Sequence, residues 1–254
     1  MKPEARQQNI LSRLRALQRE WRVDELAQAL RVSPLTIRRD LDSLTRQGAV
    51  VRTLGGCLAA GPIQNSAYQR RVATQFEEKQ AIGQEAAGEV RPGDVLIIND
   101  GSTTFHLASC LGSRGPLTIY TNSIAMIGEL SRFRDIRLYV LGGEYHADMF
   151  YLGGSLTGRV LETIEADIVF LGTDAIDSRG RCLVHDQDVA RTTQMMMRRG
   201  KRKILLADGA KLEAAGSVAY ATLRDFDLWI TSGSSSRAAM RRLRKMTQIR
   251  EVKT

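Results

Sequence analysis

The chain has 254 residues, of which 43% are hydrophobic and 26% are charged, a composition that excludes a disordered or fibrous protein and allows a small domain joined to a medium one. Its formal net charge of +9 suits a polyanionic partner, although charge by itself does not separate nucleic acid from a membrane surface. No apolar leader and no apolar run approaching roughly 18 residues is present, and the three cysteines are widely spaced, so we expect a cytoplasmic protein without membrane spans or a disulfide framework.

The first sixty residues carry over half of the excess positive charge, with 11 Lys and Arg against 6 Asp and Glu. Apolar residues at helical spacing predict one helix over residues 10–17 and a second over residues 23–30, with Asp24 as its N-cap. A third helix is predicted to begin after Ser33, whose hydroxyl can cap it. Pro34 then occupies the first helical position, where its missing N–H costs no hydrogen bond. Gly48 is suited to end this helix.

Residues 49–59 predict two short strands around Gly55 and Gly56, a small hairpin. The order helix, helix, turn, helix, hairpin is that of a winged helix-turn-helix domain. We therefore place a DNA-binding domain at residues 1–60.

The third helix divides into a buried and an exposed face. Ile37, Leu41 and Leu44 are spaced i, i+4, i+7 and must face the core. The remaining side chains of its N-terminal half are then free to enter a DNA major groove, while the hairpin arginine meets a backbone phosphate and Asp40 pairs with a neighbouring arginine. The predicted DNA-binding residues are Ser33, Thr36, Arg38, Arg39 and Arg52. The alternative is an ordinary solvated helix face.

Residues 61–76 contain glycine and proline and have little periodicity, so we expect a linker that becomes ordered towards its C-terminal end. From residue 77 onward, short and nearly continuous apolar strands alternate with helical stretches, which predicts a mainly parallel α/β domain over residues 77–254. The expected strands are residues 95–100, 117–121, 136–141, 167–172, 203–208 and 227–231. Helices are expected near residues 103–111, 123–133, 187–200 and 235–245.

Polar or glycine-bearing segments follow most of these strands, where α/β sheets bind ligands. The loop DGSTT, residues 100–104, runs into a helix, and its backbone N–H groups and threonine hydroxyls are suited to a phosphate. Lys211 either adds a cation to such a phosphate or pairs with Asp208. Each of these residues is also an ordinary turn or helix cap, and only their recurrence at several strand ends favours a binding site. Three short polar side chains are suited to sugar hydroxyls: Asp100, Asn122 and Asp174.

No motif for nucleoside triphosphates, dinucleotides or a common hydrolase is present, and we expect no catalytic residue, metal or cofactor. His106 and Cys110 lie i, i+4 on one expected helix, but no further zinc ligand is near them in sequence. His146 and His185 are isolated and are expected at the surface or in hydrogen bonds. Two basic segments are expected to be solvated helix ends: residues 198–203 and 241–245.

The stretch VSPLTIRRDLDSLTRQGAVVRTLGG, residues 32–56, resembles the N-terminal signature of the DeoR-type bacterial transcriptional regulators. Further along, EEK, DGSTT, YTNS, LGGE, LGTDAID and ADGAK are similar to that family's landmarks and occur in the same order, so the resemblance covers nearly the whole chain. Two departures stand out. Leu54 precedes the hairpin glycines where the family usually has histidine, and Lys211 lies between Ala210 and Leu212 where serine and phenylalanine are commoner.

The resemblance implies a winged-helix domain on an α/β domain similar to ribose-5-phosphate isomerase and glucosamine-6-phosphate deaminase. It also implies binding to an operator in double-stranded DNA and, usually, repression of a carbohydrate-use operon relieved by a phosphorylated sugar or related metabolite. The effector residues that it implies are Gly101, Ser102, Thr103, Thr104, Asp208 and Lys211. The resemblance extends the same site to Asn122, Gly143 and Asp174.

A single winged-helix domain makes few DNA contacts, so we expect a homo-oligomer that spans repeated half-sites. An effector would then shift the population between DNA-competent and incompetent assemblies. Two other functions stay open at this point. A sugar-phosphate isomerase or deaminase carrying a DNA-binding head would need Asp100 or Asp174 as its general base, whereas a structural nucleic-acid protein would bind no small ligand.

Overall fold

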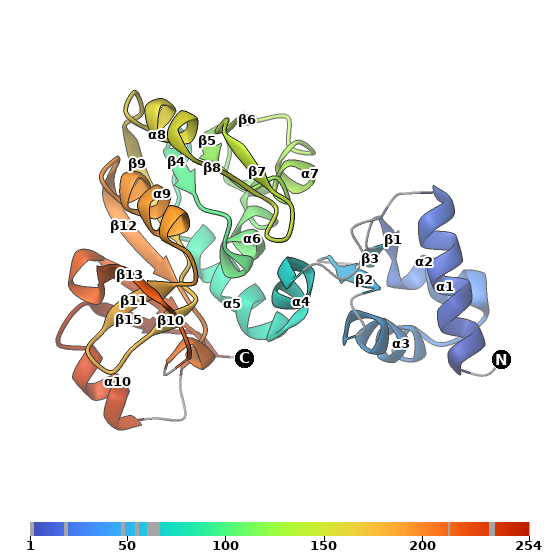
Figure 1. Ribbon diagram of the computed structural model, residues 1–254. Helices are drawn as coiled ribbons and strands as arrows, with labels where there is room; N and C mark the ends of the chain where they lie inside the picture. The colour runs from blue at the N-terminus through green and yellow to red at the C-terminus, as the bar shows by residue number, and fades with distance from the viewer. Residues whose placement is uncertain are drawn as a thin grey trace. The chain divides into compact units, whose positions relative to one another are not determined.

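The computed structural model describes residues 3–17, 20–46, 49–53, 56–59, 67–212, 214–233 and 237–253. The chain divides into two compact units, Met1–Phe76 and Glu77–Thr254 (Figure 1). The three cysteines are all free. Within the described residues, no helix combines the length and the apolar character needed to cross a membrane.

The first unit contains the winged helix-turn-helix elements in the predicted order. Its helices are α1 (Pro3–Leu17), α2 (Val23–Leu30), α3 (Pro34–Arg46) and α4 (Ala67–Ala73). Its antiparallel sheet has the order β1-β3-β2, with β1 (Trp21–Arg22), β2 (Val50–Arg52) and β3 (Gly56–Ala59). Strand β1 was not predicted, because two residues are too short for a periodic pattern.

The core of the first unit joins the apolar faces of its three main helices to buried residues of the small sheet. Ile37, Leu41 and Leu44 of α3 are at most 1% exposed, which confirms the predicted inward face. They pack in one cluster with residues of α1 and α2 such as Leu14 and Leu26. Burial of this stripe fixes which side chains of α3 are left for the solvent.

Two expected helix boundaries fare differently. Helix α2 covers the expected residues, Val23–Leu30, but Asp24 lies in its first turn and not at the N-cap. The N-cap is Arg22, whose backbone N–H donates to the Glu25 side chain at 3.0 Å. The expected end of α3 at Gly48 lies outside the described residues, as does the hairpin residue Gly55.

Helix α4 lies within the segment expected to be a linker. Tyr68 and Val72, at i and i+4, are 3% and 4% exposed, and α4 packs against α3 and β2. The second half of residues 61–76 therefore belongs to the packed first unit, while residues 61–66 lie outside the description.

The second unit is built on a seven-stranded sheet with the order β15-β14-β12-β9-β4-β5-β6. All six pairings are parallel, which confirms the predicted α/β class. The strands are β4 (Val95–Ile98), β5 (Leu117–Thr121), β6 (Ile136–Val140), β9 (Ala166–Leu171), β12 (Gly200–Leu206), β14 (Leu228–Thr231) and β15 (Gln248–Glu251). Six of them were expected, and β15 was not, because an edge strand with polar and charged residues lacks the apolar run of a buried one.

Helices cover both faces of this sheet. One apolar cluster joins Val169 and Leu205 to α8 (Ser155–Leu161) and α9 (Gln187–Met197). The other joins Ile168 and Ile204 to helices on the opposite face. Neighbouring strand residues thus face different layers, which explains the nearly continuous apolar strands in the sequence. The helices of the second face are α5 (Phe76–Ala87), α6 (Ser102–Ala108) and α7 (Ile127–Leu130).

Smaller elements complete the second unit. Strands β10 (Ala175–Ile176), β11 (Arg181–Val184) and β13 (Val218–Thr222) form an antiparallel sheet, and β7 (Glu144–His146) pairs with β8 (Tyr151–Gly153) as a hairpin. Helix α10 (Arg237–Leu243) precedes the last strand.

Candidate DNA-binding and effector sites

The exposed face of α3 carries two free arginines. Arg38 and Arg39 are both exposed, and neither forms an ion pair with any residue that the structure describes. Ser33 caps the helix as expected, because its hydroxyl accepts from the Thr36 N–H at 3.2 Å and lies 2.9 Å from the Thr36 hydroxyl. Leu35, in the first turn, is 56% exposed and was not predicted as a contact residue. An exposed leucine beside free guanidinium groups is suited to a thymine methyl group.

Asp40 does not pair with a neighbouring arginine, and that expectation is wrong. The carboxylate is 3% exposed and accepts from Arg6 of α1, with Nε to Oδ2 at 2.5 Å and a second contact at 3.1 Å. The hydrogen bond to Asp40 raises the pKa of Arg6. Asp40 follows Ile37 by three residues and so lies at the edge of the buried stripe, where it ties α3 to α1 and leaves Arg38 and Arg39 without a carboxylate.

Arg52 lies on β2 of the wing and pairs with Asp42 of α3 at 3.3 Å. The Asp42 side chain is 63% exposed, and a surface pair of this kind contributes at most about 1 kcal/mol. A DNA phosphate can therefore replace the carboxylate at little cost. Leu54, where the sequence departs from the family pattern, lies outside the described residues.

The ends of β4, β9 and β5 bring several predicted effector residues together. The Asn122 side chain donates to Asp100 at 3.1 Å and to the Leu152 carbonyl at 3.2 Å. A Cβ on Gly101 would lie 3.4 Å from the Cα of Gly172, so the loops after β4 and β9 touch through glycine. These contacts make the carboxyl edge of the central strands one surface.

Asn99 holds this surface together and was missed by the sequence reasoning. Its buried side-chain oxygen accepts from the backbone N–H of Gly172 at 3.0 Å and of Gly101 at 3.3 Å. The Thr104 hydroxyl lies 2.7 Å from the Gly101 carbonyl and 2.8 Å from the Asn99 carbonyl, so it shapes the loop from inside. Ser102 and Thr103 are also buried. The only signal for Asn99 in the sequence is its place directly before DGSTT, and the apolar run 95–98 extends the expected strand through it.

Two buried oxygen atoms at this edge have no hydrogen-bond partner within the described residues: Oδ1 of Asn122 and Oδ2 of Asp208. Both residues are 1% exposed, and both atoms can only accept. A buried acceptor without a donor is costly, and the hydroxyl groups of a ligand would remove that cost. The hydroxyls of Ser123 and Thr231 are unpaired and buried in the same way.

Lys211 and Asp208 do not pair. Asp208 accepts from the Ala210 N–H at 3.1 Å, and the Lys211 ammonium makes no ion pair with any described residue. Of the two roles considered for Lys211, the geometry favours a free cation. Strand order separates Asp208 from Asn122 by three strand spacings, about 14 Å, so these two ends are not in contact.

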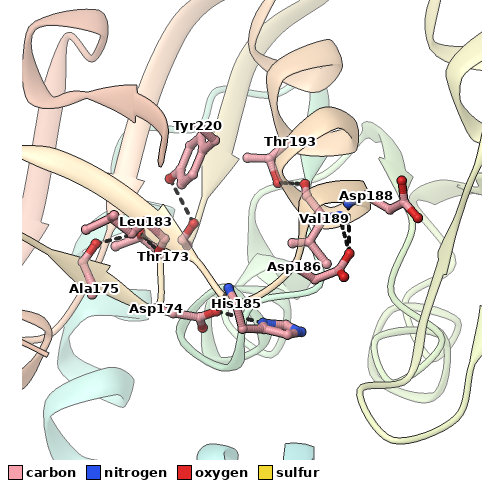
Figure 2. A network of polar contacts seen from close by, with 11 residues as sticks. Thr173, Asp174, Ala175, Leu183, His185, Asp186, Asp188, Val189, Thr193 and Tyr220 are labelled. Carbon is pink, nitrogen blue, oxygen red and sulfur yellow. Dashed lines mark hydrogen bonds and ion pairs between the residues drawn. The ribbon is translucent and has the colours of Figure 1, made fainter. Parts of the chain in front are cut away.

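Asp174 is hydrogen-bonded to His185, which was expected from the sequence to be an isolated histidine (Figure 2). Its Oδ2 accepts from the His185 backbone N–H at 3.0 Å and lies 2.8 Å from Nδ1 of the same residue. The next residue, Asp186, caps α9. Burial acts to raise the pKa of Asp186, but the backbone N–H groups of Asp188 and Val189 outweigh it, so the pKa is lowered. His185 is therefore a further residue at the central strand end, held by a carboxylate.

Gly143 has a packing role. Its φ is +150°, and a Cβ there would lie 2.2 Å from the Gly153 carbonyl oxygen and 2.4 Å from the Thr157 hydroxyl. Only glycine allows the β7–β8 hairpin and α8 to approach so closely. Among the described residues, no group of three or more His, Cys, Asp or Glu side chains could hold a metal ion.

Comparison with known families accounts for both units. The pattern described as "DeoR-like helix-turn-helix domain" matches residues 6–61, and the pattern described as "DeoR C terminal sensor domain" matches residues 74–233.

Several curated proteins are similar over most of the chain. The HTH-type transcriptional repressor GlcR of Bacillus subtilis is 34% identical over 209 residues, which are 82% of this chain and 80% of that protein. The HTH-type transcriptional repressor CsqR of Escherichia coli is 31% identical over 77% of this chain and 75% of its own length. The glycerol-3-phosphate regulon repressor of the same species is 31% identical over 74% and 75%.

Solved structures resemble the chain only distantly. Ribose 5-phosphate isomerase A from Neisseria gonorrhoeae has a TM-score of 0.42 and 17% identity, and the match covers 56% of this chain and 55% of the isomerase. The β subunit of eIF2B from Chaetomium thermophilum has a TM-score of 0.46 and 15% identity, covering 61% and 48%. Similarity this low carries no argument about activity.

Proposed function

The chain belongs to the DeoR family of transcriptional regulators, and from this we propose that it represses a carbohydrate-use operon until a phosphorylated sugar or related metabolite binds its second unit. As a member of that family it is a DNA-binding regulator and not an enzyme. The alternative function, a sugar-phosphate isomerase or deaminase with a DNA-binding head, is therefore excluded. The observation that carries the effector proposal is the buried side-chain oxygen of Asn122, which has no hydrogen-bond partner among the described residues and belongs to a side chain bonded to Asp100. We propose that the protein acts in the cytoplasm without a cofactor or metal.

The chemistry of the strand ends supports an effector with two different parts. The unpaired acceptor on Asn122 requires a donor, which a sugar hydroxyl supplies and a phosphate dianion does not. Lys211 and the backbone N–H groups of residues 102–104 are donors and would take the phosphate. Asp100 and Asp174 stay as candidate hydroxyl acceptors, the latter with His185 beside it.

Replacing Lys211 with glutamine is expected to weaken binding of a phosphorylated sugar by about tenfold or more, because a charge-assisted hydrogen bond to phosphate is lost. The measurement is a thermal-shift titration with glycerol 3-phosphate, ribose 5-phosphate and glucosamine 6-phosphate, followed by operator binding with any compound that stabilises the protein. Lys245→Gln is the matched control, since Lys245 is an exposed lysine far along the chain. If no phosphorylated sugar stabilises the wild type, the effector proposal fails.

Replacing Arg38 with alanine is expected to lower operator affinity by about 1–3 kcal/mol if this residue reads a base. The measurement is a binding titration with operator and with scrambled DNA at fixed salt. A loss on the operator alone assigns Arg38 to base recognition, and an equal loss on both assigns it to the phosphate backbone. Arg13→Ala removes the same charge from α1 as a control. Unchanged affinity for both DNAs would remove Arg38 from the interface.

We also propose that the protein is a homo-oligomer joined through its second unit. Six large hydrophobic side chains are exposed in the described residues, and five of them come from β6, β7 and α8: Tyr139, Val140, Tyr145, Leu156 and Val160. Strand β6 is also an edge of the sheet. Exposed apolar side chains on and after an open edge strand support subunit contact.

The double variant Leu156→Glu, Val160→Glu is expected to dissociate the oligomer, because two charges enter the apolar surface. Sedimentation velocity across a concentration series measures the effect. Gln248→Glu on the opposite sheet edge is the control and should leave the assembly intact. A wild type that sediments as a monomer, free and on operator DNA, would contradict the proposal.

A further inference from the structure

A hollow of about 700 Å³ opens on the second unit at the end of the sheet opposite the candidate effector site. It is bordered by the C-terminal end of α9, by β13 and by the segment before β14. Asp227 in its wall directly precedes β14, whereas Asp208 follows β12 at the carboxyl edge. Lys203 and Asp208 are five residues apart along an extended segment, about 16 Å. The hollow and the effector residues are therefore separate places.

Three cations line the hollow and have no acidic partner among the described residues: Arg198, Lys203 and Arg224. They come from the end of α9, from β12 and from the turn after β13. The basic segment 198–203 was expected to be a solvated helix end, but its cations have two different environments in the structure. Lys201 pairs with Asp167 at 2.9 Å and Arg202 pairs with Glu89 at 2.5 Å, while Arg198 and Lys203 face the hollow.

The two carboxylates in the wall are held by hydrogen bonds to neutral groups and not by cations. Asp225 accepts from the Thr222 N–H at 2.7 Å and from the Thr222 hydroxyl at 2.9 Å. Asp227 accepts from the Lys203 backbone N–H at 2.8 Å. The lining therefore has three cationic and two anionic side chains, a net charge of +1, and no ion pair between described residues joins them.

The floor of the hollow is apolar. Met197, Tyr220 and Phe226 are each less than 9% exposed, and the two aromatic rings meet edge to face with centroids 6.5 Å apart. The Gln194 side chain donates to the Tyr220 carbonyl at 3.1 Å and fixes the end of α9 against β13. Cationic side chains without ion pairs, above well-packed side chains, give this hollow the donors that an anionic ligand needs.

We propose that this hollow is a second ligand site, which binds a small metabolite carrying a doubly charged phosphate group. Two arginines from different elements offer planar forks that match phosphate oxygens, and Lys203 adds a third charge. The site is independent of the effector proposed above, because it uses neither Lys211 nor the Gly101–Thr104 loop.

The test uses the full chain and inorganic pyrophosphate as the probe, with binding measured by calorimetry at constant ionic strength. The double variant Arg198→Gln, Arg224→Gln is expected to bind pyrophosphate at least about tenfold more weakly than the wild type, because two charge-assisted contacts are removed. Arg241→Gln, at an exposed arginine of α10, is the matched control and should bind as the wild type does. Circular dichroism verifies that each variant is folded, and Lys203→Met, expected to weaken binding too, provides a second variant.

Lys211→Gln separates this proposal from the effector proposal. If the hollow is the site, Lys211→Gln retains a pyrophosphate-binding event that the double arginine variant has lost. If pyrophosphate binding is lost in Lys211→Gln and kept in the double arginine variant, the hollow is not a ligand site. A wild type that does not bind pyrophosphate, or a double variant that changes only DNA affinity, also overturns the proposal.

Discussion

Replacing Asp40 with alanine is expected to lower the free energy of unfolding of the first unit by about 1–3 kcal/mol, because the largely buried Arg6 guanidinium loses the carboxylate that accepts two of its N–H groups. The side chains of this pair are 11% and 4% exposed, and the pair joins α1 to the recognition helix α3. Hydrogen exchange of the amides of α1 and α3 in increasing urea measures the loss in this unit separately from the second. Operator affinity should fall as well, since α3 loses its fixed position.

The double variant Arg6→Ala, Asp40→Ala distinguishes a stranded charge from a general defect. Removing both partners leaves no uncompensated charge, so the double variant should be more stable than Asp40→Ala alone. Asp42→Ala, which breaks a surface pair, should change stability by no more than about 1 kcal/mol. If Asp40→Ala is as mild as Asp42→Ala, the buried pair does not hold the two helices.

Replacing Asn99 with alanine is expected to destabilise the second unit by about 2–4 kcal/mol, because the backbone N–H groups of Gly101 and Gly172 both lose their acceptor. The same change should abolish stabilisation by phosphorylated sugars, since it releases the loops after β4 and β9 from each other. Chemical unfolding and the thermal-shift titration measure the two effects. Asn9→Ala on the exposed side of α1 is the control, and equal stability of the two variants would contradict the role given to Asn99.

The sequence predicted the parallel sheet because strands covered on both faces are continuously apolar, as in 95–98 and 168–171. It did not predict the edge strand β15, because Ile249 is the one apolar residue of Gln248–Glu251 and the strand is partly exposed. In the first unit, the inward face of α3 followed from helical spacing. The partner of Asp40 did not, because Arg6 is 34 residues away and only the packing of α1 on α3 brings them together.

The candidate effector residues were predicted from one rule, that ligands meet the carboxyl ends of parallel strands. That rule gives no strand order. From this rule alone, we could not predict that Asn122 is bonded to Asp100 or that Asp208 lies three strands away from Asn122. The order of strands in the sheet depends on which faces pack together and not on their position in the chain. The role of Asn99 was hidden for a related reason. Its two N–H donors come from loops that are 71 residues apart, Gly101 and Gly172.

The strand order also has a consequence for how the protein is made. Strand β15 pairs with β14, yet it consists of residues 248–251 and so is synthesised after the other six strands of the sheet. Until then, the outer edge of the fully buried strand β14 has no neighbour, and an open apolar edge readily recruits other chains. A translation product that stops before residue 248 would keep its DNA-binding unit while exposing that edge, so it would be cleared or would aggregate with its DNA-binding surface still attached.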